Sequence, residues 1–190
     1  MKRLITLGVC LLILFSLVSC KSKDPFEIYE SYGGKCHQEL TMHFYNANGT
    51  YAGKQYGDVY KEPGITYRVT DGFLGPYKQY FDDNDRLYEY NYTENKWYKK
   101  KSDSLDTNFD GWWDKDNYDY KNGIYTLKGY IDIGQQEYRL VYIDKSGFLV
   151  TEEKIIYDGF YVIEERKYIE GGKDYNLKFP EKYTTQYGNS

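Results

Sequence analysis

The sequence predicts a mainly β protein, in which an antiparallel meander forms a curved sheet or half-open barrel after one short helix. Three observations predict this class. From Glu39 onward apolar residues alternate with polar ones, clusters of Asn, Asp and Gly separate the alternating runs, and tyrosine, a strong strand former, occurs 25 times. An alternation of period two places every second side chain on the same face of a strand. We therefore expect strands that pack on one face and are wetter on the other.

The alternating runs are separated by turn residues about every ten to twenty positions, which predicts roughly ten strands because Asn, Asp and Gly tolerate the positive φ of tight hairpins. The clearest runs are Leu40–Tyr45, Ile65–Thr70, Tyr138–Ile143 and Phe160–Ile169. The turn clusters are Asn46–Gly49, Glu62–Gly64, Asp82–Asp85, Lys121–Gly123, Asp144–Gly147, Asp158–Gly159 and Gly171–Gly172.

One helix is expected over residues 24–32. Asp24 is a capping residue, Pro25 suits the first helical position, and Glu27 completes the pattern of a capping box. Gly33 and Gly34 end the segment. One apolar stripe runs along it, made of Phe26, Tyr29 and Tyr32.

The first twenty residues indicate the compartment. Lys2 and Arg3 precede an apolar run over residues 4–18. A run of about fifteen residues is near the length of a signal peptide and shorter than the roughly 20 residues of a spanning helix. It ends in Leu17-Val18-Ser19-Cys20, after which the chain turns polar at once.

This tetrapeptide resembles the lipobox of bacterial lipoproteins. The resemblance implies a diacylglycerol thioether on Cys20, cleavage before that residue, and a protein anchored to the cell membrane or outer membrane that faces the periplasm or exterior. The expected organisation is a signal peptide over 1–19, an acylated anchor and tether over 20–23, a single strand-rich domain over 24–183 and a C-terminal tail over 184–190. The alternatives are an uncleaved helix and an ordinary secretory signal that contains a cysteine.

Charge and cysteine content exclude several classes of protein. The formal net charge is −4 and the only basic run is residues 99–101, so we expect no nucleic-acid partner. Once Cys10 is removed and Cys20 is acylated, Cys36 remains alone and the domain has no internal disulfide. We expect Cys36 to be a buried small hydrophobe, and the alternatives are a reactive thiol or an intermolecular bridge.

A candidate calcium loop lies between the two groups of strands. Its oxygen ligands would be Asp106, Asn108, Asp110 and Asp114, with Gly111 at the sharp turn, as in the first part of an EF-hand or thrombospondin-type loop. The pattern departs at the twelfth position, where Asn117 replaces the expected Glu. The alternative is a polar connector without a metal, and we expect no other cofactor.

Other motifs give weaker signals, and we expect no enzymatic activity. Cys36 and His37 are neighbours in a strand, so their side chains point to opposite faces and form no nucleophile pair. Trp97, Trp112 and Trp113 could stack on sugar rings, although core and loop packing is the favoured interpretation. The tyrosines either line a cavity or simply express β propensity. The sequence contains no Gly-rich phosphate loop, nucleophile elbow or HExxH pattern.

An acyl anchor, a short leading helix and a long aromatic meander resemble the LolA/LolB-like and LppX-like envelope lipoproteins. The segments that carry this resemblance are 88–98, 117–128 and 175–180. It implies a half-open β-barrel that wraps a helix and holds lipid or acyl chains.

The resulting hypothesis is a membrane-anchored, non-enzymatic binding module for a hydrophobic ligand, a lipid or a protein partner. The alternative is a surface interaction or adhesion module with a calcium-stabilised loop and no ligand cavity.

Overall fold

The predicted fold class is confirmed. A computed structural model describes residues 23–82, 86–101, 110–129 and 136–185, and within them one open sheet of twelve strands carries a single α-helix, α2 (Pro25–Ser31), and two short 3-10 helices, η1 (Asp110–Trp113) and η2 (Lys115–Asn117). The strands are β1 (Cys36–Asn46), β2 (Tyr51–Glu62), β3 (Ile65–Gly72), β4 (Tyr77–Phe81), β5 (Arg86–Asn91), β6 (Lys96–Lys101), β7 (Tyr118–Lys121), β8 (Ile124–Leu127), β9 (Gln136–Ile143), β10 (Leu149–Tyr157), β11 (Phe160–Gly171) and β12 (Thr184–Thr185).

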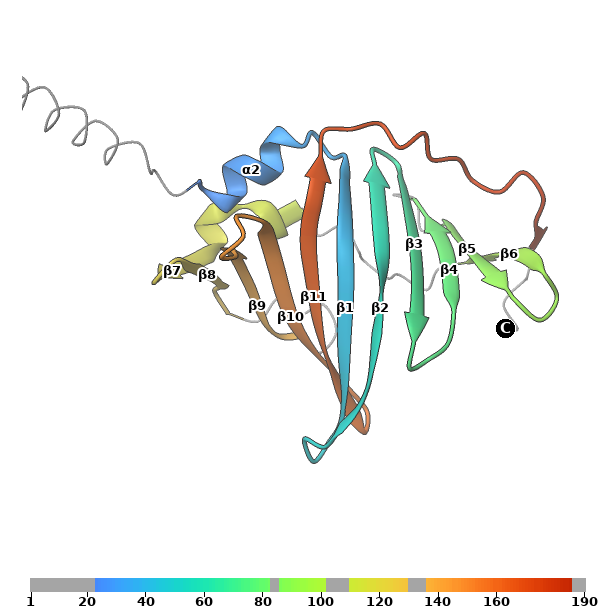
Figure 1. Cartoon of the computed structure of the whole chain (residues 1–190), viewed down its shortest axis with the longest axis horizontal. Helices are drawn as coiled ribbons and strands as arrows, with labels where there is room; N and C mark the ends of the chain where they lie inside the picture. The colour runs from blue at the N-terminus through green and yellow to red at the C-terminus, as the bar shows by residue number, and fades with distance from the viewer. Residues whose placement is uncertain (1–22, 83–85, 102–109, 130–135, 186–190) are drawn as a thin grey trace, which may run out of the picture.

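The sheet consists of two meanders joined side by side. Strands β1 to β6 follow one another as antiparallel hairpins, and so do β7 to β11. The first strand of the first meander, β1, pairs antiparallel with the last strand of the second, β11, at the centre of the sheet (Figure 1). At one edge β12 pairs in parallel with β6, so the two threonines assigned from sequence to the C-terminal tail contribute to the sheet.

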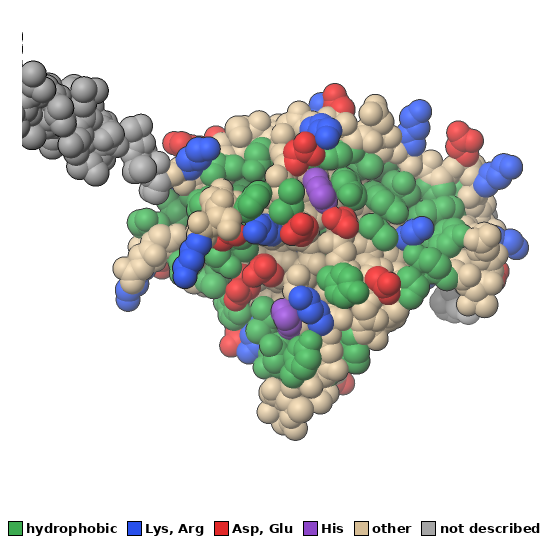
Figure 2. Space-filling model, in the orientation of Figure 1, with side chains coloured by type: hydrophobic (Ala, Val, Ile, Leu, Met, Phe, Trp, Pro, Cys, Tyr) green, Lys and Arg blue, Asp and Glu red, His purple; other side chains and the backbone are tan. Residues whose placement is uncertain are grey.

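The register divides the side chains between two faces. Leu40, Met42 and Phe44 lie on the face that α2 partly covers, which we call the inner face, together with Glu164 and Arg166 of β11. The opposite, outer face carries the odd-numbered residues of β1, including both histidines of the chain, which are the purple side chains in Figure 2. Acidic, basic and apolar side chains alternate over that outer face (Figure 2).

The predicted helix is confirmed, and its ends follow the expected chemistry. The Asp24 side chain accepts a hydrogen bond from the Phe26 backbone N–H at 3.0 Å, and Pro25 occupies the first turn. Gly33 and Gly34 end the segment with φ values of 57° and 76°, a region that suits glycine. In the described part of the chain, helices are all too short and too polar to span a bilayer.

Two apolar clusters pack on the inner face. The first lies under α2, where the Phe26 ring meets Tyr118 and Tyr125 edge to face at 5.2 and 5.0 Å, and where Cys36 is buried. The second lies in the middle of the sheet and has no helix over it in the described residues. It consists of Leu40, Met42, Phe44, Val59 and Val162.

The outer face is held by a ladder of stacked aromatic rings rather than by an apolar core. Tyr67 stacks on Tyr80 at 4.5 Å, and His37 stacks on Tyr60 at 4.4 Å. The segment that follows β11 runs along one end of the sheet to β12 (Figure 1). Glu62 anchors that segment, since its carboxylate accepts hydrogen bonds from three successive backbone N–H groups, those of Tyr175, Asn176 and Leu177.

Gly57 marks a close approach of β2 to β3. A Cβ atom at this position would lie 2.0 Å from the Val69 carbonyl oxygen, a distance that real Cβ atoms do not adopt. Gly57 lies opposite Leu40 on one side and Thr70 on the other, on the inner face. Only glycine therefore permits this backbone packing.

Candidate functional site

A band of charged side chains crosses the inner face of the sheet. Strand pairing places Arg139 of β9 opposite Glu153 of β10, and Glu153 opposite Glu164 of β11. Glu164 in turn lies opposite Met42 of β1. We call the whole set the charged band, and it comprises Arg139, Glu153, Glu164, Arg166, Arg68, Tyr77, Glu89 and Lys100.

At one end of the band, Arg139 is fully compensated. It forms an ion pair with Glu153, and its Nε–H donates to the Tyr118 hydroxyl at 3.0 Å. The guanidinium carbon lies 4.4 Å from the centroid of the Trp112 ring, a cation–π contact. Both partners of the ion pair are buried. In a buried ion pair with these additional contacts, the attractive interactions offset the free energy lost when two charges are removed from water.

In the middle of the band, two arginines share one carboxylate. The Nε–H of Arg166 donates to Glu164 Oε1 at 2.5 Å, while Nη2 of Arg68 lies 3.7 Å from Glu164 Oε2. Burial by itself raises the pKa of the Glu164 carboxyl, but the guanidinium groups of Arg166 and Arg68 lower it by more. The net result is a pKa below the usual range, so Glu164 is held ionised.

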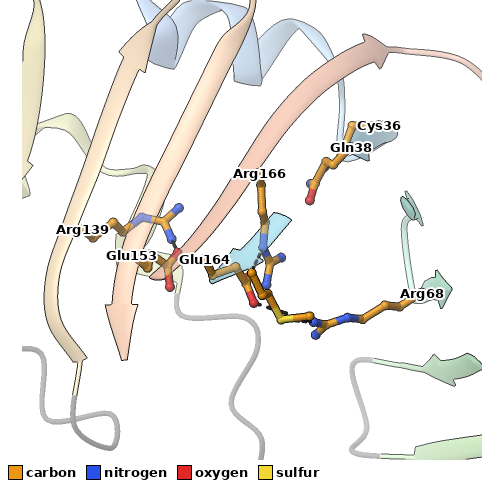
Figure 3. A network of polar contacts seen from close by, with 8 residues as sticks. Cys36, Gln38, Arg68, Arg139, Glu153, Glu164 and Arg166 are labelled. Carbon is orange, nitrogen blue, oxygen red and sulfur yellow. Dashed lines mark hydrogen bonds and ion pairs between the residues drawn. The ribbon is translucent and has the colours of Figure 1, made fainter. Parts of the chain in front are cut away.

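Arg68 is the cation with the poorest compensation. Its Nη2 group donates to the Met42 sulfur at 3.0 Å, and thioether sulfur is a weak acceptor. Its Nε atom is buried and has no hydrogen-bond partner among the described residues. Burial lowers the pKa of the Arg68 guanidinium, although Glu164 opposes this shift. Figure 3 shows the Arg68 side chain extending from β3 toward Glu164. Arg139 and Glu153 lie beyond Glu164, on the side away from Arg68.

The far end of the band contains a smaller network on β4, β5 and β6. Glu89 accepts a hydrogen bond from the Tyr77 hydroxyl at 3.0 Å, and it forms an ion pair with Lys100 at 2.8 Å. Burial raises the pKa of the Tyr77 hydroxyl, and the Glu89 carboxylate raises it further. Tyr77 is therefore a neutral hydrogen-bond donor at physiological pH.

The band contains more cations than anions. Four cationic side chains (Arg139, Arg166, Arg68 and Lys100) face three carboxylates (Glu153, Glu164 and Glu89). The two arginines that share Glu164 are partly exposed, at 29% for Arg166 and 21% for Arg68, whereas Arg139 is 3% exposed. The unbalanced positive charge therefore lies in the middle of the band, on partly exposed side chains.

The structure separates the remaining candidate residues. Asp106 and Asn108 of the predicted calcium loop lie outside the described residues, Asp110 begins η1, and the Asp114 side chain caps η2 by accepting the Asp116 N–H at 3.1 Å. Among described residues, the His, Cys, Asp and Glu side chains form no group of three suited to a metal. The calcium loop, and Cys20 in the undescribed first segment, stay predictions.

Cys36 and His37 point to opposite faces, as predicted. Cys36 is 1% exposed in the cluster under α2, and burial raises the pKa of its thiol. His37 lies on the outer face, where its Nε2 atom is 2.7 Å from Asp58 Oδ1. A buried, protonated thiol without a histidine beside it has the properties of a packing residue.

The two adjacent tryptophans make intramolecular contacts. Trp113 stacks on Tyr29 with centroids 3.6 Å apart and a 6° angle between the rings. Trp112 covers Arg139, and its buried indole nitrogen has no hydrogen-bond partner in the described part of the chain. Each ring therefore has one face in contact with another residue of the chain, which agrees with the packing interpretation.

Sequence reasoning missed the charged band. Its signal was present as charged residues at inward positions of alternating runs, since Glu164 and Arg166 are two apart in β11 and Arg139 shares the inner face with Val141. The local pattern does not reveal which charged residues meet, because the pairing of β1 with β11 determines this.

No protein-family model and no curated protein matches this sequence.

We predict that Glu164 contributes to the acid sensitivity of the fold. Because the folded pKa of Glu164 is lowered, its stabilising contribution is present above the unfolded value near 4.5 and is lost as pH falls below it. In Glu164→Gln the free energy of unfolding should fall less steeply with decreasing pH in this window, where one carboxyl contributes at most about 1.4 kcal/mol per pH unit.

Chemical denaturation between pH 3 and 7 measures this slope. At pH 7 the same variant should be less stable by about 3–5 kcal/mol, since Arg68 and Arg166 lose their shared anion. Glu165→Gln is the matched control because it removes a carboxylate from the outer face of the same strand. Equal acid slopes for the wild type and Glu164→Gln would contradict the prediction.

Proposed function

We propose that this protein is a membrane-anchored extracytoplasmic lipoprotein whose inner sheet face binds a ligand with a hydrophobic part, without catalysing a reaction. The observation that carries the proposal is the second apolar cluster. It lies in the middle of the inner face beside an incompletely neutralised guanidinium, Arg68. A packed structural core rarely leaves a buried charge so poorly compensated, whereas a binding face does so where a ligand supplies the missing partner.

Exposed apolar side chains support this assignment. Six of the eleven exposed large apolar side chains among the described residues lie at the turns that join β1 to β2, β3 to β4 and β10 to β11, at the end of the sheet away from α2 (Figure 1). We call this set the apolar rim, and its members are Tyr51, Phe73, Leu74, Ile156, Tyr157 and Phe160. Phe73 joins the rim to the inner cluster, since its ring lies 5.5 Å from that of Phe44. Exposed groups of this kind favour contact with apolar molecules.

The chemistry of the charged band favours binding over acid–base catalysis. Glu153 and Glu164 each pair with arginine, and the lowered pKa of Glu164 leaves it without a proton to donate at neutral pH and makes it a weak base. The thiol of Cys36 is buried and its pKa is raised. These groups orient and attract a ligand more readily than they transfer protons.

The membrane part of the proposal rests on the lipobox-like residues 17–20. We expect metabolic labelling with a palmitate analogue to mark the wild type and Cys36→Ala, because both retain Cys20. Cys20→Ala should be unlabelled and should leave the membrane fraction. A labelled or membrane-bound Cys20→Ala protein would contradict lipid attachment at this residue.

The ligand part is tested on the mature chain with Cys20→Ser, which keeps every described helix and strand. Native mass spectrometry should detect co-purifying lipid, and the protein should take up a fluorescent fatty acid. Leu74→Ser, in the apolar rim, should reduce uptake, whereas Tyr120→Ser, equally exposed but on β7, should not. Protein that carries no lipid and takes up no fatty acid would overturn the proposal.

A further inference from the structure

Resting on the proposed function, we infer that the ligand of the inner face is an amphiphile with one anionic head group, a carboxylate or a phosphate, which the Arg68 guanidinium binds. The inference goes beyond hydrophobic binding because it assigns the head-group charge and the residue that recognises it. It follows from three features of the charged band: its unbalanced charge, the unused donors of Arg68, and the apolar surface that begins beside that residue.

The charge balance favours a monoanion. Within the band, four cations face three carboxylates, so one added negative charge neutralises it. The chain as a whole carries a formal net charge of −4, so its overall field repels anions. Attraction of an anion to the inner face must therefore come from this local excess of positive charge.

The Arg68 guanidinium has the geometry to bind an anion on the inner face. Arginine binds carboxylates and phosphates through two parallel N–H groups. Among the described residues, the Arg68 Nε–H has no partner, and Nη2 contacts the Met42 sulfur and, at 3.7 Å, Glu164. An oxyanion would satisfy these donors better than the thioether does. The Arg68 side chain as a whole is 21% exposed, although its Nε atom is buried. Arg139, by contrast, is 3% exposed and already has its own carboxylate, hydroxyl and ring partners.

A row of apolar side chains leads from Arg68 to the exposed apolar rim, and its first members, Met42 and Phe44, are themselves buried. Met42, in contact with Arg68, is followed two residues later in β1 by Phe44, which lies opposite Val162. Phe44 contacts Phe73, which is 51% exposed in the apolar rim. The side chains therefore change from charged (Arg68 of β3) to buried apolar (Met42 and Phe44 of β1) to exposed apolar (Phe73, after β3). This order matches a molecule with a charged head and a hydrocarbon tail.

The test compares four amphiphiles of equal chain length on the mature chain with Cys20→Ser. Dodecanoate and dodecyl phosphate carry anionic heads, glyceryl monododecanoate is neutral, and dodecyltrimethylammonium is cationic. Below their micelle concentrations, both anions should bind at least tenfold more tightly than the neutral and cationic compounds in titration calorimetry. This ratio is measured with Arg68 unchanged, so it does not depend on any substitution at that residue. The ratio of dodecanoate to dodecyl phosphate then distinguishes a fatty-acid source from a phosphate-bearing one.

The variant Arg68→Met keeps the length of the side chain and removes its charge. It should weaken anion binding at least tenfold and leave the neutral compound within about twofold. Arg68→Lys, which keeps the charge without the fork of donors, should lie between the two. Lys78→Met is the matched control, because Lys78 lies on the neighbouring strand β4 and points to the outer face.

The outcomes separate the two proposals. Equal binding of anionic, neutral and cationic amphiphiles, or anion binding unchanged in Arg68→Met, would overturn the head-group assignment and leave the proposed function standing. Binding of none of the four compounds would overturn both.

Discussion

The pairing of β1 with β11 is the constraint on which the rest of the structure depends. It joins two meanders that are otherwise consecutive hairpins, and it does so across more than a hundred residues of chain. Through this pairing Met42 lies opposite Glu164 and Leu40 opposite Arg166. Because these two strands share a register, Glu164 and Arg166 meet Arg68 in the charged band, and Val162 joins the second apolar cluster.

The band shows how buried charge can serve two purposes on one face. At Arg139 the guanidinium meets a carboxylate, a hydroxyl and an aromatic ring, so the charge stabilises a closed part of the sheet under η1. At Arg68 the same residue type has a sulfur contact and an Nε atom that is unpaired within the described residues. Natural sheets seldom retain such a group for stability alone, because its contacts do not offset the free energy lost when the charge is removed from water.

Features set by short-range chemistry were predictable from the sequence. The cap at Asp24, the glycines that end α2, the alternation in β1 and the burial of Cys36 follow from neighbouring residues, and the structure confirms them. The charged band was not predictable, since Arg68 and Glu164 are far apart in the chain and two strands lie between them. The tyrosine-rich composition was correctly linked to strands, but the main aromatic ladder lies on the outer face, opposite the band.

Amide hydrogen exchange tests the central role of the β1–β11 pairing most directly. If this pairing holds both meanders together, the amides at the centre of β1 and β11 should exchange most slowly and at the same rate, because only global unfolding exposes them. Amides of the four-residue strands β7 and β8 and of β12 should exchange faster. Fast exchange in β11 while β1 to β6 stay protected would mean that the first meander is stable alone, and would contradict the account.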